Sequence, residues 1–217
     1  MDFELERVMG ELKSERPVFH NERDFQFALA WKIKEIYPNY SIRLEYCFPE
    51  MQENKRSYVD LVVSDDSNCI LFELKYKTIK AEITDTNTNE KYLLQNHGAR
   101  DLGCYYVLND LSRIEKQVLD EGQINGRKII AAYSILITND ERYKTGFRAG
   151  SLCENYGFNR KRFCANKEIK FNTKEKAKEE TCVKNLKEIS LLRDYDVNWE
   201  TYSDLGLSMV VFECKKE

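Results

Sequence analysis

Residues 58–77, YVDLVVSDDSNCILFELKYK, predict a β-hairpin. Its two halves, 58–64 and 69–77, are rich in Val, Leu, Ile, Phe and Tyr, a composition typical of strands. The four residues between them, Asp-Asp-Ser-Asn, are typical of a turn. We therefore expect two neighbouring antiparallel strands joined by a short connection.

The expected pairing register gives this hairpin one apolar and one polar face. With the turn centred between residues 66 and 67, residues whose numbers sum to 133 lie opposite each other. Asp60 is then opposite Glu73, at a Cβ separation of roughly 5 Å. Lys75 lies on the same face, two residues along the strand. The other face is apolar and contains Val59, Leu61, Val63, Ile70, Phe72 and Leu74.

A helix is predicted over residues 20–37, before the hairpin. His20 or Asn21 can cap it, and Pro38 ends it. Its apolar face is formed by Phe25, Leu29, Ile33 and Ile36. Glu22 lies three residues before this face begins and therefore points the same way, towards the interior.

The polar face of the hairpin has the chemistry of a metal site. Two adjacent carboxylates repel each other, and burying them is costly unless a cation joins them. Asp60 and Glu73 are oxygen donors of the kind that Mg²⁺ or Mn²⁺ prefers. Glu22 and the main-chain carbonyl of Leu74 are further candidate ligands. Lys75 could orient a water molecule or offset charge on a phosphate.

Simpler roles remain open for the same residues. A Glu-x-Lys pattern on a strand is a weak motif alone, and Glu73 could pair with Lys75 or Lys77 on a solvated face. Glu22 could serve only as a first-turn residue that the helix dipole favours. The predicted position of Asp60 opposite Glu73 favours the metal site.

The remaining elements predict one mixed α/β domain over residues 1–217. We expect its core at about 20–138 and 183–217. The further predicted elements are a strand at 41–48, a helix within 95–119, a strand at 127–138, a short helix at 185–197 and a strand at 207–215.

Residues 151–182 predict a basic surface excursion or small insertion. Between positions 159 and 178 the sequence contains eight Lys or Arg residues and only two Glu residues. Arg160, Lys161 and Arg162 could hold a nucleic-acid backbone, with Phe163 stacked on a base. A solvated charged surface is the alternative.

Composition excludes several classes of protein. The net charge of -3 is not that of a histone-like protein. The seven cysteines contain no Cys-x-x-Cys pair, so neither a zinc ribbon nor a disulfide framework is indicated. No apolar run approaches the roughly 18 residues of a membrane span. We expect a cytoplasmic protein with no membrane partner.

The site residues resemble those of the PD-(D/E)XK nuclease superfamily. Its acid and its Glu-x-Lys correspond to Asp60 and Glu73-Leu74-Lys75, and its frequent first-helix acid corresponds to Glu22. Val59 stands where the superfamily name has proline. The resemblance implies a restriction-endonuclease-like mixed central sheet flanked by helices.

The resemblance also implies roles for individual residues. Asp60, Glu73, Leu74 and Glu22 would bind Mg²⁺ or Mn²⁺, and Lys75 would take part in catalysis. The substrate would be contacted beyond the site by Lys77 and Gln95. The simpler roles are a solvated edge strand for Lys77 and, favoured over substrate contact, helix capping or surface solvation for Gln95.

The resulting prediction is a metal-dependent deoxyribonuclease. The alternative is a catalytically inactive module of the same fold that binds nucleic acid or a protein partner. RNA remains open as the substrate, as do strandedness and endo- or exonuclease action. Many enzymes that cut both strands are homodimers, but nothing in the sequence marks an interface.

Overall fold

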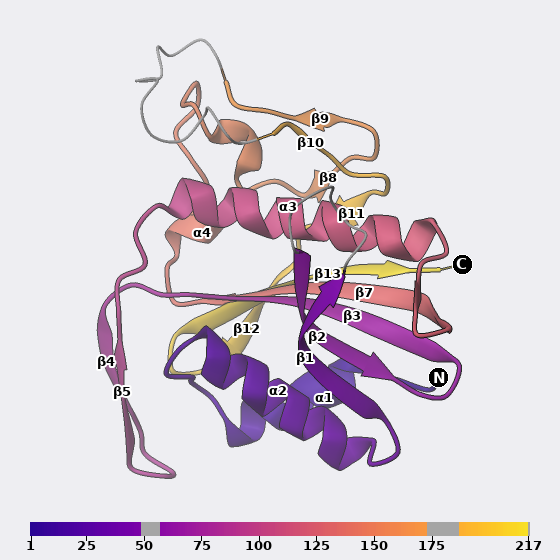
Figure 1. The fold of residues 1–217 in the computed structure, drawn as a ribbon. Coiled ribbons are helices and arrows are strands. Elements are labelled where there is room, and N and C mark those ends of the chain that lie inside the picture. The colour runs from indigo at the N-terminus through magenta and orange to yellow at the C-terminus, as the bar shows by residue number, and fades with distance from the viewer. Residues whose placement is uncertain (49–56, 173–186, 217) are drawn as a thin grey trace.

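The computed structural model describes residues 1–48, 57–172 and 187–216. It is a mixed α/β fold in which helices cover both faces of one central sheet (Figure 1). The sheet strands follow the order β1-β2-β3-β7-β13-β12, and β6 pairs with β7 at the side. Their bounds are β1 Ser41–Phe48, β2 Ser57–Ser64, β3 Asn68–Lys77, β6 Gln123–Ile124, β7 Arg127–Thr138, β12 Trp199–Ser203 and β13 Leu207–Lys215.

One pair of neighbouring strands is parallel, and it lies at the centre of the sheet. β3 and β7 run in the same direction, whereas all other neighbours in the sheet are antiparallel. A parallel pair needs a long crossover connection. Here the crossover contains a β-hairpin and helix α3; the elements are β4 Ala81–Asp85, β5 Glu90–Leu94 and α3 Arg100–Leu119.

Two helices pack below the sheet in Figure 1, and α3 packs above it. The lower helices are α1, Leu5–Glu15, and α2, Glu22–Ile36. The predicted capping of α2 is confirmed, because the Asn21 side chain accepts a hydrogen bond from the main-chain N–H of Asp24. Its predicted inward residues Phe25, Leu29 and Ile33 are fully buried. The mixed α/β class predicted from the sequence is confirmed.

Several elements were not predicted from the sequence, including α1, the β4–β5 hairpin, β12 and the short helix α4, Arg142–Thr145. α1 lies before the expected start of the core, yet it buries Val8 and Leu12 against the α2 side of the sheet. The β4–β5 hairpin projects from one edge of the fold (Figure 1). β12 forms an edge strand of the central sheet.

Of the two forms expected for residues 151–182, the described part agrees with a small insertion packed on the core and not with a surface excursion. Residues 151–172 and 187–197 form a layer over α3 that contains a 3₁₀ turn and four short strands (Figure 1). They bury Tyr156, Phe158 and Phe163 against the core. These elements are η1 Glu154–Tyr156, β8 Arg162–Phe163, β9 Glu168–Ile169, β10 Ile189–Ser190 and β11 Tyr195–Asp196.

The short helix predicted at 185–197 is wrong for residues 187–197, and positions 185 and 186 lie outside the described residues. This segment pairs with the chain before it, β10 with β9 and β11 with β8. Glu115 on α3 holds it in place, because its carboxylate accepts hydrogen bonds from Leu192 N (2.9 Å) and Tyr195 Oη (2.8 Å). Two hydrogen bonds compensate the burial of this carboxylate.

No helix of the described chain is long and apolar enough to cross a membrane.

Candidate functional site

The β2–β3 hairpin has the predicted register, but its two strands separate at the candidate site. Leu61 pairs with Phe72 and Val63 with Ile70. Pairing ends at Leu61, so the predicted direct opposition of Asp60 and Glu73 is not part of the ladder. Val59 is also not on the predicted face, because it packs in the apolar cluster on the α3 side.

Asp60 occupies the fork where the strands separate. Its Oδ2 atom accepts a hydrogen bond from Leu74 N at 2.6 Å, in place of a main-chain acceptor on β2. The side-chain amide of Gln26 on α2 donates to the main-chain O of Asp60, also at 2.6 Å. Asp60 is therefore fixed from both sides, by β3 and by α2.

Glu73 is buried on the face of the sheet that α3 covers. Its side chain is 2% exposed, so a solvated face, the simpler reading of its Glu-x-Lys pattern, is excluded. The guanidinium of Arg113 donates to Glu73 Oε1, and it also donates to Ser57 Oγ and to Tyr58 O. Arg113 thus joins α3, β2 and β3.

Lys75 is the centre of the site. Its Nζ atom lies 2.9 Å from Asp110 Oδ2, 3.9 Å from Glu73 Oε2 and 4.0 Å from Asp60 Oδ2. It donates to the main-chain O of Leu74 at 3.2 Å. Four oxygen atoms from β2, β3 and α3 therefore surround one ammonium group.

Glu22 is at the start of α2 and approaches β3 from the face of the sheet opposite to α3. Its Oε2 atom accepts hydrogen bonds from Tyr76 N (3.0 Å) and Lys77 Nζ (3.2 Å). With Asp60 and Leu74 it lines a cavity of about 100 Å³ at the N-terminus of α2. The other lining residues are Arg23, Gln26 and Glu45.

Burial and charge shift the ionisation of the central groups. Burial raises the pKa of Glu73 well above its ordinary value, and Asp110 adds to this shift while Arg113 opposes it. Burial also raises the pKa of Asp60, against the effect of Lys75. Burial disfavours the charge on Lys75, but the neighbouring carboxylates, Asp110 first, outweigh it and raise the pKa of Lys75. Lys75 is therefore an ammonium group at neutral pH.

The raised pKa of Glu73 predicts a pH dependence of stability. A carboxyl group whose pKa is raised on folding stabilises the fold fully below its unfolded pKa, 4.5 for this glutamate. This stabilisation is lost as the pH rises through the folded pKa. We expect the free energy of unfolding of the metal-free protein, measured with urea, to fall less steeply above pH 5 in Glu73→Gln than in the wild type.

Glu121 provides the control for this experiment. It is exposed, and its hydrogen bond with Lys216 lowers its pKa. Glu121→Gln should therefore change the pH dependence only below about pH 4.5. Equal slopes for the wild type and Glu73→Gln between pH 5 and 8 would show that Glu73 is not perturbed.

The oxygen atoms around Lys75 can be compared with the ligands that the predicted Mg²⁺ or Mn²⁺ ion requires. No group of three or more His, Cys, Asp or Glu side chains converges on one possible metal position in the described residues. However, Asp60, Glu73 and the Leu74 carbonyl surround the Lys75 ammonium, a position already occupied by a cation. Mg²⁺ keeps several waters and needs only one or two carboxylates. Two carboxylates and a carbonyl fit that requirement.

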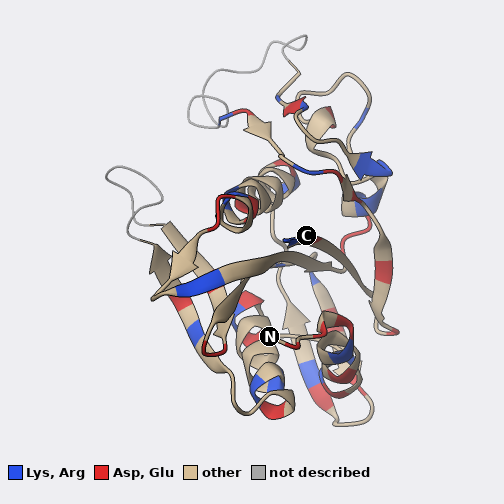
Figure 2. Cartoon of the chain, turned by 90° about the vertical axis from the view of Figure 1, so that its right-hand side faces the viewer, with Lys and Arg blue, Asp and Glu red and all other residues tan. Residues whose placement is uncertain are grey.

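Two of the other predicted nucleic-acid-binding residues, Arg160 and Arg162, are engaged within the protein. Arg160 donates to the main-chain oxygens of Gly157 and Glu154, and Arg162 pairs with Asp194 and Asp196. Lys161 and Gln95 are exposed. Phe163 is 2% exposed and cannot stack on a base without refolding. Basic and acidic residues are interspersed in the view of Figure 2.

Two residues of the site, Asp110 and Arg113, were missed by the sequence analysis. They lie three residues apart on α3, each just before an inward residue, Leu111 or Ile114. Their position beside the buried residues of the helix was a usable signal. The part of the sheet that this helix crosses could not be known from the sequence.

Comparison of the chain with protein-family models, with curated proteins and with solved structures found no match.

Proposed function

We propose that this protein is a metal-dependent nuclease of PD-(D/E)XK type that hydrolyses phosphodiester bonds of DNA. The observation that carries the proposal is the position of the Lys75 ammonium among oxygens of Asp60, Glu73 and Leu74. The order α2, β1, β2, β3, α3, β7, with β3 parallel to β7, supports a restriction-endonuclease-like core.

Each residue of the site has a role in this proposal. Asp60, Glu73 and the Leu74 carbonyl would hold Mg²⁺ or Mn²⁺, and Glu22 would act across the small cavity. When bound, the ion supplies positive charge to the phosphate and lowers the pKa of a water molecule. Lys75 stays protonated, so it would orient water and stabilise charge on the phosphate rather than accept a proton.

Asp110 and Arg113 would control the two central side chains. Asp110 holds the Lys75 ammonium at 2.9 Å, which fixes its position and keeps it charged. Arg113 neutralises Glu73 and competes with any ion for that carboxylate. We therefore treat Asp110 as a positioning residue and Arg113 as a competitor of the metal.

The same contacts support a second candidate, an inactive module of this fold. Lys75 and Arg113 already balance two of the three carboxylates Asp60, Glu73 and Asp110. An ion-pair network of this kind can be structural and need no metal. In that case the protein would bind nucleic acid or another protein through a different surface.

Metal binding and cleavage by the wild-type protein distinguish the two candidates. Mn²⁺ would be titrated calorimetrically, and supercoiled plasmid, single-stranded DNA and RNA would be incubated with Mg²⁺, Mn²⁺ or EDTA. Metal binding together with metal-dependent DNA cleavage would support the nuclease. Cleavage of RNA alone would change the substrate class. Absence of both Mn²⁺ binding and cleavage would favour the inactive module.

A further inference from the structure

Four residues form a row along the outward face of α2. Arg23, Phe27 and Trp31 are spaced by four residues, and Lys34 follows three residues later, so their side chains lie side by side on one face of the helix. Phe27 is 64% exposed and Trp31 is 77% exposed, and both basic residues are exposed as well. We call these four residues the α2 row. It presents two aromatic side chains between two basic ones.

The two aromatic side chains of the row do not belong to the core. The side of α2 that faces the core is formed by Phe25, Leu29 and Ile33, which are fully buried. Large aromatic side chains usually bury most of their surface when a protein folds. Two that stay exposed on adjacent turns of one helix are not scattered single residues, and they indicate a surface that contacts a ligand or a partner.

The charge of the α2 row is positive. Arg23 has no hydrogen-bond or ion-pair partner among the described residues. Lys34 donates to the main-chain oxygens of Pro38 (2.6 Å) and Tyr40 (2.8 Å), which carry no net charge. Both cations can therefore attract an anionic group. The acidic side chains of α2 are already paired with basic ones: Glu22 with Lys77, Asp24 with Arg16, and Glu35 with Lys32.

The α2 row begins at the small cavity of the candidate site. Arg23 lines this cavity of about 100 Å³ together with Glu22, Asp60 and Leu74. Trp31 lies eight residues further along the helix, about 12 Å away at the rise of an α-helix. Since α2 lies on the outside of the sheet in Figure 1, the row leads from the cavity across the surface. A polymer bound along the row would therefore reach the candidate metal ligands.

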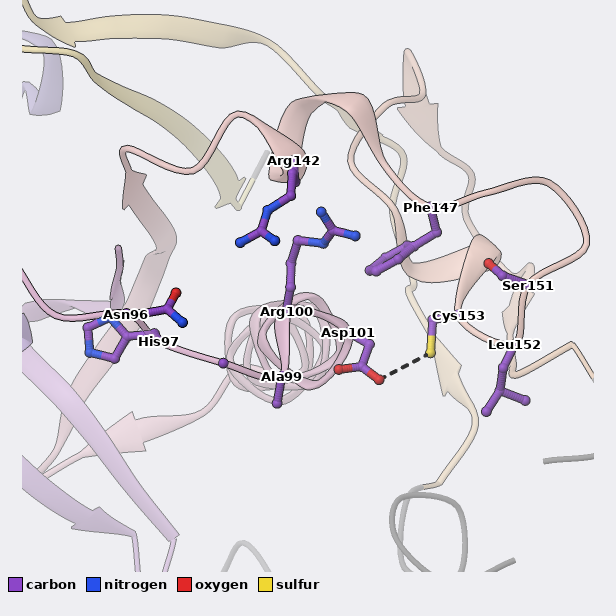
Figure 3. Close-up of a pocket in the computed structure, with 11 residues that line it drawn as sticks. Asn96, His97, Ala99, Arg100, Asp101, Arg142, Phe147, Ser151, Leu152 and Cys153 are labelled. Carbon is purple, nitrogen blue, oxygen red and sulfur yellow. Dashed lines mark hydrogen bonds between the residues drawn. The ribbon is translucent and has the colours of Figure 1, made fainter. Parts of the chain in front are cut away.

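The cavity at the start of α3, of about 530 Å³, differs from this surface because its arginines are engaged within the chain. Arg100 is directed towards the Phe147 ring, and its guanidinium carbon lies 4.9 Å from the ring centre (Figure 3). Arg142 pairs with Asp140 at 2.7 Å. Exposed positive charge and exposed aromatic side chains thus coincide on α2 and not at this cavity.

We propose that the α2 row binds single-stranded DNA. Its Phe and Trp rings can stack on bases, while its Arg and Lys side chains contact phosphates of the same strand. Bases in a duplex are already stacked and paired, so a stacking surface of this kind selects unpaired strands. The inference names the substrate of the proposed nuclease, and it rests on that function for the choice of DNA and for the passage of the strand into the cavity.

Binding of a short fluorescein-labelled oligothymidylate to the full-length protein, measured by fluorescence anisotropy in EDTA, tests this surface. We expect the wild type to bind, and Phe27→Ala and Trp31→Ala each to bind about tenfold more weakly. Leu93→Ala should bind as the wild type does, because Leu93 is as exposed as Phe27, at 64%, but lies on β5. All three substitutions remove exposed atoms and should leave the fold intact.

The salt dependence of binding separates the stacking residues from the basic ones. The logarithm of the affinity falls with the logarithm of the NaCl concentration, with a slope of about 0.7 for each phosphate contact of a single strand. Arg23→Met should reduce this slope by about that amount, whereas Trp31→Ala should leave it unchanged. Arg7→Met should change neither affinity nor slope, because Arg7 pairs with Glu11 on the exposed surface of α1.

Tryptophan fluorescence provides a direct readout of stacking. The chain has two tryptophans, and Trp199 packs against the core and donates a hydrogen bond to Phe158 O. Unlabelled oligothymidylate should quench the emission of the wild type, because a base stacks on Trp31. Trp31→Phe should still bind, since it keeps an aromatic ring, but its remaining emission should not be quenched.

Several results would overturn the inference. The surface is disproved if the wild type does not bind in EDTA, if Phe27→Ala and Trp31→Ala both bind as tightly as the wild type, or if Leu93→Ala weakens binding equally. Tighter binding of a duplex or of an RNA strand of the same length would overturn the choice of single-stranded DNA. A dimer in light scattering that Trp31→Ala dissociates would identify a second copy of the chain as the occupant instead.

Failure of this inference is distinguishable from failure of the proposed nuclease, because binding in EDTA requires neither metal nor cleavage. Metal-dependent plasmid cleavage by a wild type that does not bind the oligothymidylate would retain the nuclease and reject the surface. Binding that depends on Trp31, without any metal-dependent cleavage, would retain the surface and reject the nuclease.

Discussion

Glu73→Gln is expected to reduce metal-dependent DNA cleavage by roughly three orders of magnitude. The substitution keeps the size of a side chain that is 2% exposed, but it removes one of two central carboxylate charges. A neutral amide is a poor ligand for Mg²⁺. Initial rates of plasmid cleavage at saturating Mg²⁺, together with the Mn²⁺ affinity from calorimetry, would measure the effect.

Lys75→Met separates metal binding from catalysis in the same assay. Removing the ammonium frees the oxygens of Asp60, Glu73 and Leu74, so Mn²⁺ affinity should be retained or increased. Cleavage should nevertheless fall by roughly a hundredfold or more, since the charge near the phosphate is lost. Unchanged cleavage in both Glu73→Gln and Lys75→Met would reject this site as the catalytic one.

Arg113→Met should increase the affinity for Mn²⁺ by roughly tenfold or more. The arginine pairs with Glu73, so the substitution removes a positive charge that repels a metal ion at that carboxylate. Without metal, the same substitution leaves the buried Glu73 with only the longer contact to Lys75, at 3.9 Å, which costs about 3 kcal/mol. Urea unfolding with and without Mn²⁺ would show a loss of stability that the metal reverses.

Arg7→Met is a suitable control for the Arg113 experiment. It removes the same charge from an exposed pair on α1, so neither Mn²⁺ affinity nor stability should change by more than about 0.5 kcal/mol. Decreased or unchanged Mn²⁺ affinity in Arg113→Met would mean that the arginine does not compete with a metal. Such a result would leave the inactive module as the better explanation of the network.

The hairpin was the part of the fold that could be predicted most closely. Alternation and a turn sequence specify the pairing of two adjacent strands, and the predicted pairs Leu61–Phe72 and Val63–Ile70 are present. The fork at Asp60 could not be predicted in this way. It depends on a side-chain hydrogen bond to Leu74 and on Gln26, which comes from another element.

The helix predicted at 185–197, within the layer over α3, was wrong because the strands there are very short. β10 and β11 contain two residues each, so hydrophobic periodicity has too few positions to distinguish a strand from a helix. A signal was nevertheless present. The buried residues Ile189 and Leu191, and Tyr195 and Val197, are spaced by two, as in extended chain.

The candidate site shows the same division between local and distant contacts. Asp60, Glu73 and Lys75 belong to one hairpin, and the sequence brought them together correctly as neighbours. Asp110 and Arg113 come from a helix about forty residues away, and their contacts depend on how α3 crosses the sheet. The angle at which α3 crosses the sheet cannot be derived from hydrophobic periodicity in one sequence.

The hydrogen bond between Asp60 and Leu74 has a consequence for how relatives of this protein should be interpreted. The carboxylate replaces a strand partner for a buried amide, so Asp60 supports the architecture whether or not any reaction takes place. A relative without the proposed activity would still be under selection to keep an aspartate at this position. Loss of Lys75 would be the more informative sign that the proposed activity is absent.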